Sequence, residues 1–207
     1  MSLILYYAPF STAGTTRVAL EELGIPYQKV RLDLSTRDTD RPEFRRLNPN
    51  GQVPLIVDDG QPIFESAAIA LYLGETFGVE RGLFPAPGLA RGVAMQWIVW
   101  ANVSLAEVAQ RYRIASSPSS PSERHNQALA SWAKQAVADR LRILDQALSD
   151  RPYLLGSDYS LVDTHLAAAV HWIASLELVP GDLPALGSWL ERCTARPAFV
   201  RIMSGDA

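Results

Sequence analysis

Cysteine is almost missing from this chain of 207 residues, which has only Cys193. A single cysteine allows no internal disulfide, and it excludes both a CxxC redox pair and a cysteine-rich zinc site. Basic residues are scattered, with no run longer than Arg45-Arg46, and the net charge is −3. Nucleic acid and anionic membrane surfaces are therefore not expected partners.

Long apolar runs are lacking as well. No stretch reaches the roughly 20 residues that span a bilayer, and the N-terminus has no secretory pattern. His165 and His171 lie six residues apart, which is poor spacing for a metal site on a helix. With 48% hydrophobic and 20% charged residues, the composition is that of a globular protein with one large domain or two small ones. We expect a cytoplasmic protein without a metal.

The first 78 residues alternate between β-rich and helical patterns. Asp59-Gly60 is a strong signal for a hairpin turn between two short strands. A helix between the first two strands makes those strands parallel, whereas the hairpin is antiparallel. The order βαβ–ββα predicts a mixed four-stranded sheet of the thioredoxin type. Strands are expected at residues 3–7, 27–32, 53–58 and 62–64, and helices at 16–23 and 66–78.

The remaining chain has helical periodicity after a glycine- and proline-rich linker at residues 79–88. We expect two domains, a thioredoxin-like α/β domain at 1–78 and an all-α domain at 89–207. The sequence SLVD at Ser160–Asp163 predicts a capping box at the start of a helix, with Asp in place of the usual Glu or Gln. Helices are expected at residues 89–115, 123–148, 160–176, 184–193 and 197–203. The apolar face of the first is expected to carry Val93, Trp97, Trp100, Leu105, Val108 and Tyr112.

Two hydroxyl residues, Ser11 and Thr12, follow the first strand in the stretch LILYYAPFSTAG. Hydroxyls at the beginning of a helix can cap its free N–H groups. The same position, with the positive end of the helix dipole, can also bind an anionic ligand. The residues alone leave both roles open.

Two further positions, around Pro54 and at Glu65-Ser66, also allow a structural and a functional interpretation. Only about 5–6% of X–Pro bonds are cis, so the local sequence favours an ordinary trans proline after Val53. Ser66 is the natural N-cap of the following helix. That helix N-terminus and its serine hydroxyl can equally hold a carboxylate, while Glu65 holds an ammonium group.

Together these stretches resemble the cytosolic glutathione S-transferase family over nearly the whole chain. The matching pieces are LYYAPFST, LNPNGQVPLIVDDG, IFESAAIALYL and YSLVDTHLA. The resemblance implies glutathione as co-substrate, a homodimer and a cis bond at Pro54. It also implies that the backbone of Val53 pairs with the cysteinyl unit of glutathione. The other implied glutathione-binding residues are Pro54 beside Val53, then Gln52, Glu65 and Ser66 at the γ-glutamyl end, and Arg41 as the nearest basic candidate for the glycine carboxylate.

The resemblance places the thiol-activating residue near the end of the first strand. Aligned on YY-x-P, serine-type members have their active serine at Ser11. Cysteine-type members align instead on Thr12, and tyrosine-type members use the strand end, here Tyr6 or Tyr7. A hydroxyl would donate a hydrogen bond to the thiolate. Such a charge-assisted bond contributes about 1.5–3 kcal/mol, and lowering the thiol pKa by two units needs about 2.7 kcal/mol.

The implied activity is transfer of glutathione to small hydrophobic electrophiles, as in detoxification. An electrophile pocket is expected between the first-strand loop and the first long helix of the second domain, lined by Phe10, Trp100, Arg111 and Tyr112. The alternatives are a glutathione-dependent dehalogenase, isomerase or ether-cleaving enzyme, or a non-catalytic glutathione-binding carrier or regulatory protein of the same fold. PFSTAGTTRVAL differs from the isomerase pattern SSCSWRVRIAL. Disulfide exchange of the cysteine type is disfavoured because no cysteine lies near position 11.

Overall fold

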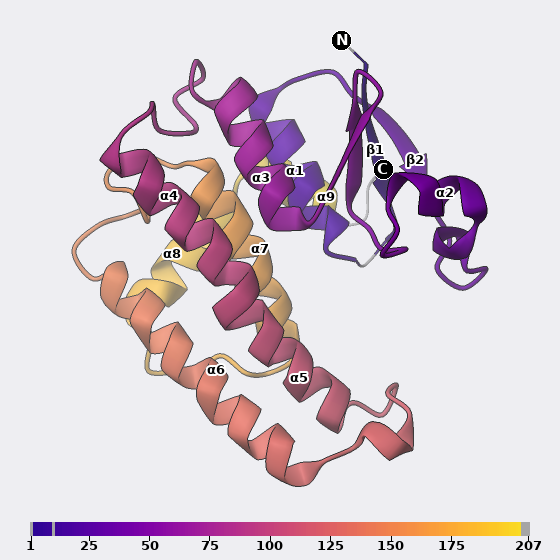
Figure 1. Ribbon diagram of the computed structural model, residues 1–207. Helices are drawn as coiled ribbons and strands as arrows, with labels where there is room; N and C mark the ends of the chain where they lie inside the picture. The colour runs from indigo at the N-terminus through magenta and orange to yellow at the C-terminus, as the bar shows by residue number, and fades with distance from the viewer. Residues whose placement is uncertain (1, 10, 204–207) are drawn as a thin grey trace. The chain divides into compact units, whose positions relative to one another are not determined.

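The computed structural model describes residues 2–9 and 11–203, so Phe10 lies outside the described residues. The chain divides into two compact units (Figure 1). The first unit extends from the N-terminus to Arg91 and also includes residues 195–203, and the second is Gly92–Thr194. This division differs from the expected domain at 89–207, because residues 89–91 and 195–203 group with the sheet.

The first unit contains a four-stranded sheet with the order β2-β1-β3-β4. Strands β1 and β2 are parallel, and the pairs β1–β3 and β3–β4 are antiparallel. The predicted mixed sheet and its βαβ–ββα order are therefore confirmed. At the hairpin, Asp59 and Gly60 have φ values of 44° and 84°, as a tight two-residue turn requires. The strands are β1 (Leu3–Tyr7), β2 (Gln28–Arg31), β3 (Leu55–Asp58) and β4 (Gln61–Phe64).

Helices cover both faces of this sheet. Helices α1 (Ala13–Leu23) and α3 (Ser66–Leu73) lie on one face, and α2 (Pro42–Leu47) lies on the other (Figure 1). A short 3₁₀ turn, η1 (Asp38–Asp40), precedes α2. Helix α1 ends at Gly24, whose φ of 62° lets its N–H close the last turn.

Helix α3 continues into a π-helical turn, η2 (Gly74–Gly78), so the expected helix over residues 66–78 is regular only in its first half. Gly74 is required by packing, because a Cβ there would lie 2.6 Å from Cδ2 of Phe84. The described residues 79–88 contain neither helix nor strand.

The last helix, α9 (Pro197–Met203), packs against α1. Arg196 donates two hydrogen bonds to the carboxylate of Glu22, at 2.8 and 2.6 Å, and only 7% of the Glu22 side chain is exposed. A second ion pair joins Arg201 to Glu21 at 3.2 Å. These contacts explain why the C-terminal segment belongs to the unit that contains the sheet.

The second unit is helical, as predicted. The helical elements over residues 89–116 follow one another as one continuous helical segment in Figure 1. In its first half the buried residues are Ala94, Ile98 and Ala101, one position away from the expected Val93, Trp97 and Trp100. Further along, Leu105 and Val108 of the expected face are buried. Small alanines on the buried face let neighbouring helices approach closely, which bulky tryptophans would prevent. The elements are α4 (Leu89–Trp100), π-turn η3 (Ala101–Ala106), α5 (Glu107–Ser116), η4 (Ser122–Arg124), α6 (Gln127–Ala147), α7 (Leu161–Ser175) and α8 (Pro184–Thr194).

A buried carboxylate organises the start of α7, and the predicted capping box is confirmed. Asp163 is fully buried. Its Oδ2 accepts hydrogen bonds from the N–H and the hydroxyl of Ser160, at 3.0 and 2.8 Å. Its Oδ1 accepts from Leu154 N–H and from the indole of Trp189, both at 2.9 Å. One side chain thus joins the start of α7 to the preceding loop and to α8.

Candidate active site

Three loops leave the same edge of the sheet. Tyr6 of β1 pairs with Leu55 of β3, and Leu55 pairs with Phe64 of β4. The C-terminal ends of β1 and β4 and the N-terminal end of β3 therefore lie beside one another. The topology brings together the polar positions that the sequence singled out, residues 11–12, 52–54 and 65–66.

Two of these loops are in direct contact. The hydroxyl of Thr12 donates a hydrogen bond to the backbone carbonyl of Val53, at 3.2 Å. The Val53–Pro54 bond is cis, which confirms the state that the family resemblance implied and the local base rate disfavoured. Thr12 is exposed and Val53 half-buried, so the contact lies at the surface.

The hydroxyl of Ser11 is engaged within its own turn. It donates to the carbonyl of Ala8 at 2.7 Å, and its oxygen accepts the N–H of Ala13 at 3.3 Å. Ser11 therefore fixes the chain where α1 begins, which is the capping role considered for it. The residue is only half-buried, so its hydroxyl is not sealed into the core.

Tyr6 and Tyr7 point to opposite faces of β1, as successive strand residues do. Tyr7 is buried under the guanidinium of Arg17, which lies 4.7 Å from the ring centroid. Tyr6 packs edge-on against Phe44 of α2, with the ring centroids 5.8 Å apart. Arg17 is itself only 7% exposed. The sequence around it does not predict that an arginine is buried there.

Glu65 adopts a backbone conformation that side-chain-bearing residues avoid. Its φ and ψ are 71° and 117°, a region that costs of order 1–3 kcal/mol and is concentrated at functional sites. The expected N-cap, Ser66, is instead the first residue of α3, and Glu65 takes the cap position without a capping hydrogen bond from its side chain. Within the described residues the exposed Glu65 carboxylate forms no hydrogen bond or ion pair.

The turn that leads to Val53 is held by a residue that the sequence analysis did not single out. Asn48 is 2% exposed. Its amide donates to the carbonyl of Gln52 at 2.7 Å, and its side-chain oxygen accepts the N–H of Asn50 at 3.1 Å. The stretch Asn-Pro-Asn-Gly carried this signal, because asparagine side chains often close turns on their own backbone.

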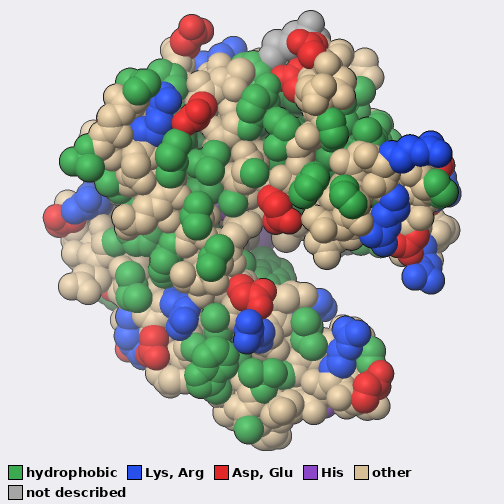
Figure 2. Space-filling view, in the orientation of Figure 1, with side chains coloured by type: hydrophobic (Ala, Val, Ile, Leu, Met, Phe, Trp, Pro, Cys, Tyr) green, Lys and Arg blue, Asp and Glu red, His purple; other side chains and the backbone are tan. Residues whose placement is uncertain are grey.

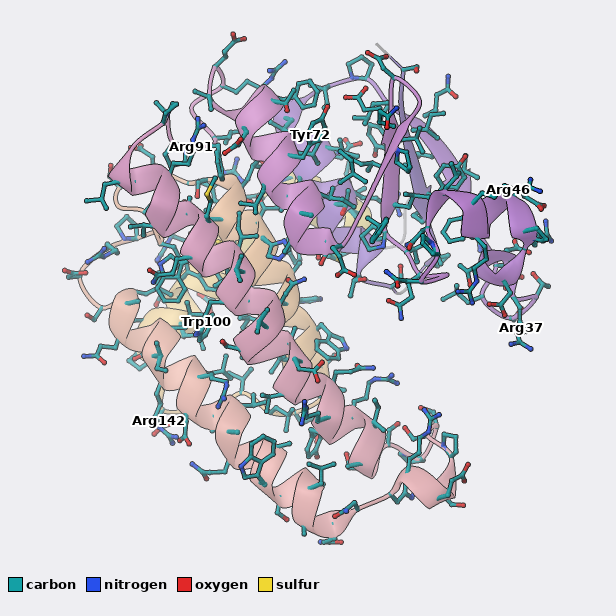
Figure 3. All side chains as sticks on the ribbon, in the orientation of Figure 1. Arg37, Arg46, Tyr72, Arg91, Trp100 and Arg142 are labelled. Atoms are coloured by element: carbon teal, nitrogen blue, oxygen red, sulfur yellow. The ribbon has the colours of Figure 1, made fainter. Side chains whose placement is uncertain are left out.

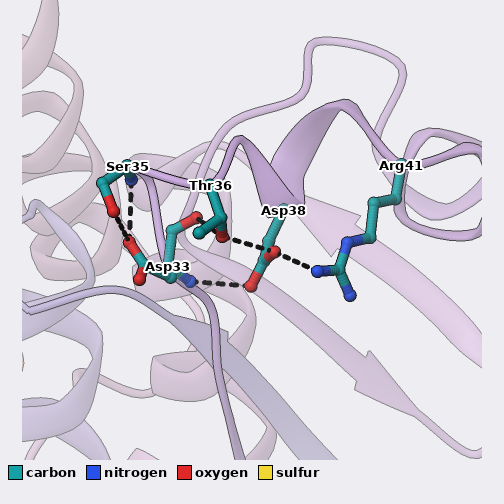
Figure 4. Close-up of polar contacts among 5 residues, drawn as sticks. All are labelled: Asp33, Ser35, Thr36, Asp38 and Arg41. Atoms are coloured by element: carbon teal, nitrogen blue, oxygen red, sulfur yellow. Dashed lines mark hydrogen bonds and ion pairs between the residues drawn. The ribbon is translucent and has the colours of Figure 1, made fainter.

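Arg41 lies in a dense polar network between β2 and α2 (Figure 4). Its guanidinium pairs with Asp38 at 2.6 Å. Asp38 also accepts hydrogen bonds from the N–H of Asp33 and the hydroxyl of Thr36, both at 2.9 Å. The Asp33 N–H is the main cause of the lowered pKa of Asp38. Arg41 is therefore already paired with a carboxylate.

The described candidates for the electrophile pocket lie in the second unit. Trp100, labelled in Figure 3, packs edge-on against Trp97 with ring centroids 5.3 Å apart. Arg111 forms an ion pair with Glu107 at 3.0 Å. The Tyr112 carbonyl accepts a hydrogen bond from Ser116 at 2.8 Å.

Of the two histidines in α7, His165 has a packing role. His165 is 4% exposed and its Nε2 lies 2.8 Å from the side-chain oxygen of Asn102. Burial lowers the pKa of His165 to about 4.

No group of three His, Cys, Asp or Glu residues in the described part of the chain could hold a metal ion. Across residues 2–9 and 11–203, no helix has the length and apolar character needed to cross a membrane.

The first unit has a thioredoxin-like fold, and a helical domain follows it. The model of the glutathione S-transferase N-terminal domain matches residues 1–75, and that of the C-terminal domain matches residues 108–197. The chain belongs to the glutathione S-transferase family.

Three similar proteins illustrate the range within the family. The chain is 32% identical to the disulfide-bond oxidoreductase YfcG of Escherichia coli, over 94% of this chain and 91% of that protein. It is 28% identical to the E. coli glutathione S-transferase GstB, over 90% and 89%. It also resembles a glutathione transferase from Burkholderia graminis solved with two glutathione molecules per subunit, with 29% identity and a TM-score of 0.87 over 99% and 88% of the two chains.

Proposed function

We propose that this protein is a glutathione transferase that activates the glutathione thiol for attack on small hydrophobic electrophiles. One observation carries the proposal: the sheet edge joins the helix-opening hydroxyls, the cis-proline loop and a strained glutamate beside a helix N-terminus. This combination supplies acceptors for an ammonium, donors for a carboxylate and open backbone for a peptide.

Glutathione is placed along that edge. The first N–H groups of α3 and the hydroxyl of Ser66 receive the γ-glutamyl carboxylate, and the Glu65 carboxylate receives its ammonium group. Gln52 supports the same end. The backbone of Val53, set by cis Pro54, pairs with the cysteinyl unit; its carbonyl retains a second lone pair beyond the Thr12 bond. Arg41 meets the glycine carboxylate in competition with Asp38.

Ser11 is the proposed thiol-activating residue. Thr12 is the alternative, and Tyr6 and Tyr7 are the remaining candidates. A free thiol with a pKa of about 8.5 is mostly protonated at neutral pH, and the thiolate is the nucleophile. A thiolate accepts a stronger hydrogen bond than a neutral carbonyl does. When glutathione binds, the Ser11 proton therefore turns from the Ala8 carbonyl to the sulfur, and the N-terminal end of α1 adds positive potential.

The thiolate then attacks an electrophilic carbon. Its lone pair forms the new S–C bond, and the leaving group departs with the electrons of the bond it loses. We propose that Trp100, Arg111 and Tyr112 of the second unit contribute to the electrophile pocket. Dehalogenase, isomerase or ether-cleaving activity would start from the same thiolate. A non-catalytic carrier would bind glutathione without lowering the pKa of the glutathione thiol.

Disulfide reduction is a second candidate, favoured by the resemblance to YfcG. Glutathione itself supplies the thiol, so a protein cysteine is not needed. The thiolate attacks one sulfur of a substrate disulfide, forms a mixed disulfide and releases the other sulfur as thiolate. A second glutathione then releases the remaining thiol and leaves oxidised glutathione.

We further propose a cytoplasmic homodimer that acts in detoxification. The single cysteine suits a reducing compartment. Four apolar residues on α4 and η3 are exposed, Leu89 at 88%, Val93 at 36%, Val99 at 46% and Val103 at 66%, and such a stripe commonly marks an interface. Light scattering should report a dimer that Val103→Asp dissociates. Ile143→Asp, at an exposed apolar site on α6, is the matched control.

The test of the site is glutathione affinity followed by rate. Glu65→Ala and Ser66→Ala should each weaken the Kd for glutathione by about tenfold or more, the loss of one charged hydrogen bond. Glu80→Ala, at an exposed acidic position of the same unit, should have no effect. Unchanged affinity in both site variants would overturn the site.

The test of the chemistry uses glutathione with a chloronitrobenzene and, separately, with hydroxyethyl disulfide. A transferase turns over the first, and a disulfide reductase prefers the second. Ser11→Ala should raise the pKa of the bound thiol and slow both reactions. If rate and thiol pKa are both retained in Ser11→Ala, Ser11 is only a cap.

A further inference from the structure

Arg45 in α2 holds the turn that precedes the cis-proline. Its Nη1 donates to the carbonyl of Pro49 at 2.6 Å, and its Nη2 donates to Oδ1 of Asp40 at 2.7 Å. One planar guanidinium thus joins the 3₁₀ turn η1 to the turn at residues 48–52. A forked, rigid donor suits this bridging role, which a lysine ammonium cannot reproduce in full.

The same guanidinium lies against the α-carbon of Gly51. A Cβ at this position would fall 2.6 Å from Nη2 and 2.7 Å from Nε of Arg45, well inside van der Waals contact. Gly51 also has a φ of 61°, which other residues rarely adopt. The positive φ therefore favours glycine at this position, and a Cβ there would in addition force the Arg45 guanidinium to move.

Gly51 is separated from Val53 by a single residue. Buried Asn48 fixes the inner side of the turn through its bonds to Gln52 and Asn50. Arg45, whose side chain is 41% exposed, fixes the outer side. The backbone that leads to Val53 is thus held between a buried amide and a surface guanidinium.

We propose that Arg45 is a positioning residue for glutathione, acting through Gly51 and Pro49 on the backbone of Gln52 and Val53 without touching the ligand. Asp40 is its anchor, and the second carboxylate oxygen of Asp40 is held by Arg37 at 2.8 Å. The inference rests on the proposed function, since it names glutathione as the ligand at Val53.

Loss of Arg45 frees the outer side of the turn, and binding must then order that turn. The effect should appear in affinity, because preorganisation lowers the cost of binding. It should not appear in the thiol pKa or in kcat, because Ser11 belongs to a different loop. Arg45→Ala is expected to raise the KM and Kd for glutathione about five- to tenfold, with kcat unchanged.

Arg46 provides the matched control. It is the next residue of the same helix, it is exposed, and within the described residues its guanidinium forms no hydrogen bond or ion pair. Figure 3 labels its position on α2. Arg46→Ala removes the same charge and should leave KM unchanged. An equal rise in KM for both variants would show a general charge effect and overturn the inference. Arg45→Lys should recover only part of the affinity.

A double-mutant cycle isolates the contact with Gly51. In the parent chain, Gly51→Ala meets both the guanidinium and the unfavourable φ. In the Arg45→Ala background only the φ penalty remains, so Gly51→Ala should weaken glutathione binding by a smaller factor. The same factor in both backgrounds would mean that the guanidinium does not constrain Gly51.

Amide exchange without glutathione separates this inference from the proposed function. The Gly51 N–H donates to the carbonyl of Asn48 at 3.0 Å, so its exchange reports opening of the turn. Arg45→Ala should speed that exchange several-fold and Arg46→Ala should not. If Arg45→Ala leaves the exchange unchanged, Arg45 does not hold the turn. If the parent chain fails to bind glutathione, the proposed function and the named ligand fail, and the exchange still decides what Arg45 holds.

Discussion

Asp163 and Glu65 are both carboxylates at a helix N-terminus, and their surroundings are opposite. Asp163 is fully buried and accepts four hydrogen bonds. Glu65 is exposed, stands at a φ of 71° and, within the described residues, has no partner for its carboxylate. A buried carboxylate whose two oxygens accept hydrogen bonds only from the protein itself stabilises the fold. An exposed carboxylate on a strained backbone, as at Glu65, indicates a ligand-binding role.

The charged segment formed by η1 and α2 resembles Asp163 in that its charges are used by the fold. Blue and red side chains alternate at the right edge of Figure 2, where η1 and α2 lie in Figure 1. Arg37, Arg41 and Arg45 are each paired with an aspartate there. These three arginines therefore belong to a network that fixes the segment itself, whereas the neighbouring Arg46 stands outside it.

The largest expected effect comes from Asp163→Asn. The substitution replaces one acceptor oxygen by an NH₂ group, so two buried donors face a donor instead of an acceptor. We expect the free energy of unfolding to fall by about 2–5 kcal/mol, with no change in the Kd of the folded protein for glutathione. Urea unfolding measures the loss.

Asp182→Asn, at an exposed carboxylate, is the control and should stay within about 0.5 kcal/mol of the parent. A loss below 1 kcal/mol in Asp163→Asn would mean that the four bonds are replaceable and would remove the contrast with Glu65.

The next effect is the pH dependence that His165 imposes. Its pKa is lowered from 6.5 to about 4 by burial, so the unfolded chain takes up a proton in this interval and the native chain does not. Stability therefore falls as pH drops from about 6.5 to about 4. Between pH 7.5 and 4.5 this single group should lower the free energy of unfolding by about 2–3 kcal/mol. The measurement is the urea midpoint at both pH values for the parent and for His165→Gln.

His171→Gln, at an exposed histidine of the same helix, is the matched control. The difference between the two pH values should shrink in His165→Gln and persist in His171→Gln. A parent and a His165→Gln protein with the same pH dependence would show that the histidine titrates normally in the native state.

Glu65→Gly separates strain from binding. Glycine adopts the φ of 71° without penalty, so the free energy of unfolding should rise by about 0.5–1 kcal/mol. The lost carboxylate should weaken glutathione binding by about tenfold or more. Calorimetry gives both values. Glu65→Ala should lose binding without the gain in stability. A variant that gains stability and keeps its affinity would show that the strained glutamate has no ligand role.

Local signals predicted much of the fold. Gly24 and Asp59-Gly60 mark ends and turns through backbone preferences that act within a few residues, and the structure follows them. The docking of α9 could not be predicted in this way, because Arg196 and Glu22 are 174 residues apart. The buried face of α4 was also misassigned, because hydrophobicity alone favours Trp97 over the small Ala94 that close packing needs.

The candidate site was predicted unevenly for a similar reason. The cis state of Pro54 contradicts the local base rate, so only the family pattern indicated it. The strain at Glu65 leaves no mark on residue type. Arg45 belongs to a run of charges that resembles a solvated face, and its contact with Gly51 appears only when the turn and α2 are brought together in space. Geometry of this kind depends on several loops at once.

The smallest expected effect is that of Thr12→Val, which tests the bond between two site loops. The variant keeps the shape of threonine and removes the 3.2 Å hydrogen bond to the Val53 carbonyl. An exposed neutral bond contributes about 0.5–1 kcal/mol, so the Kd for glutathione should rise about threefold while the thiol pKa and kcat stay unchanged. Thr12→Ser keeps the hydroxyl and should match the parent. If Thr12→Val instead raises the thiol pKa while Ser11→Ala does not, the thiolate bond belongs to Thr12, and Ser11 stabilises only the start of α1. The two hydroxyls would then divide between fold and ligand as Asp163 and Glu65 do.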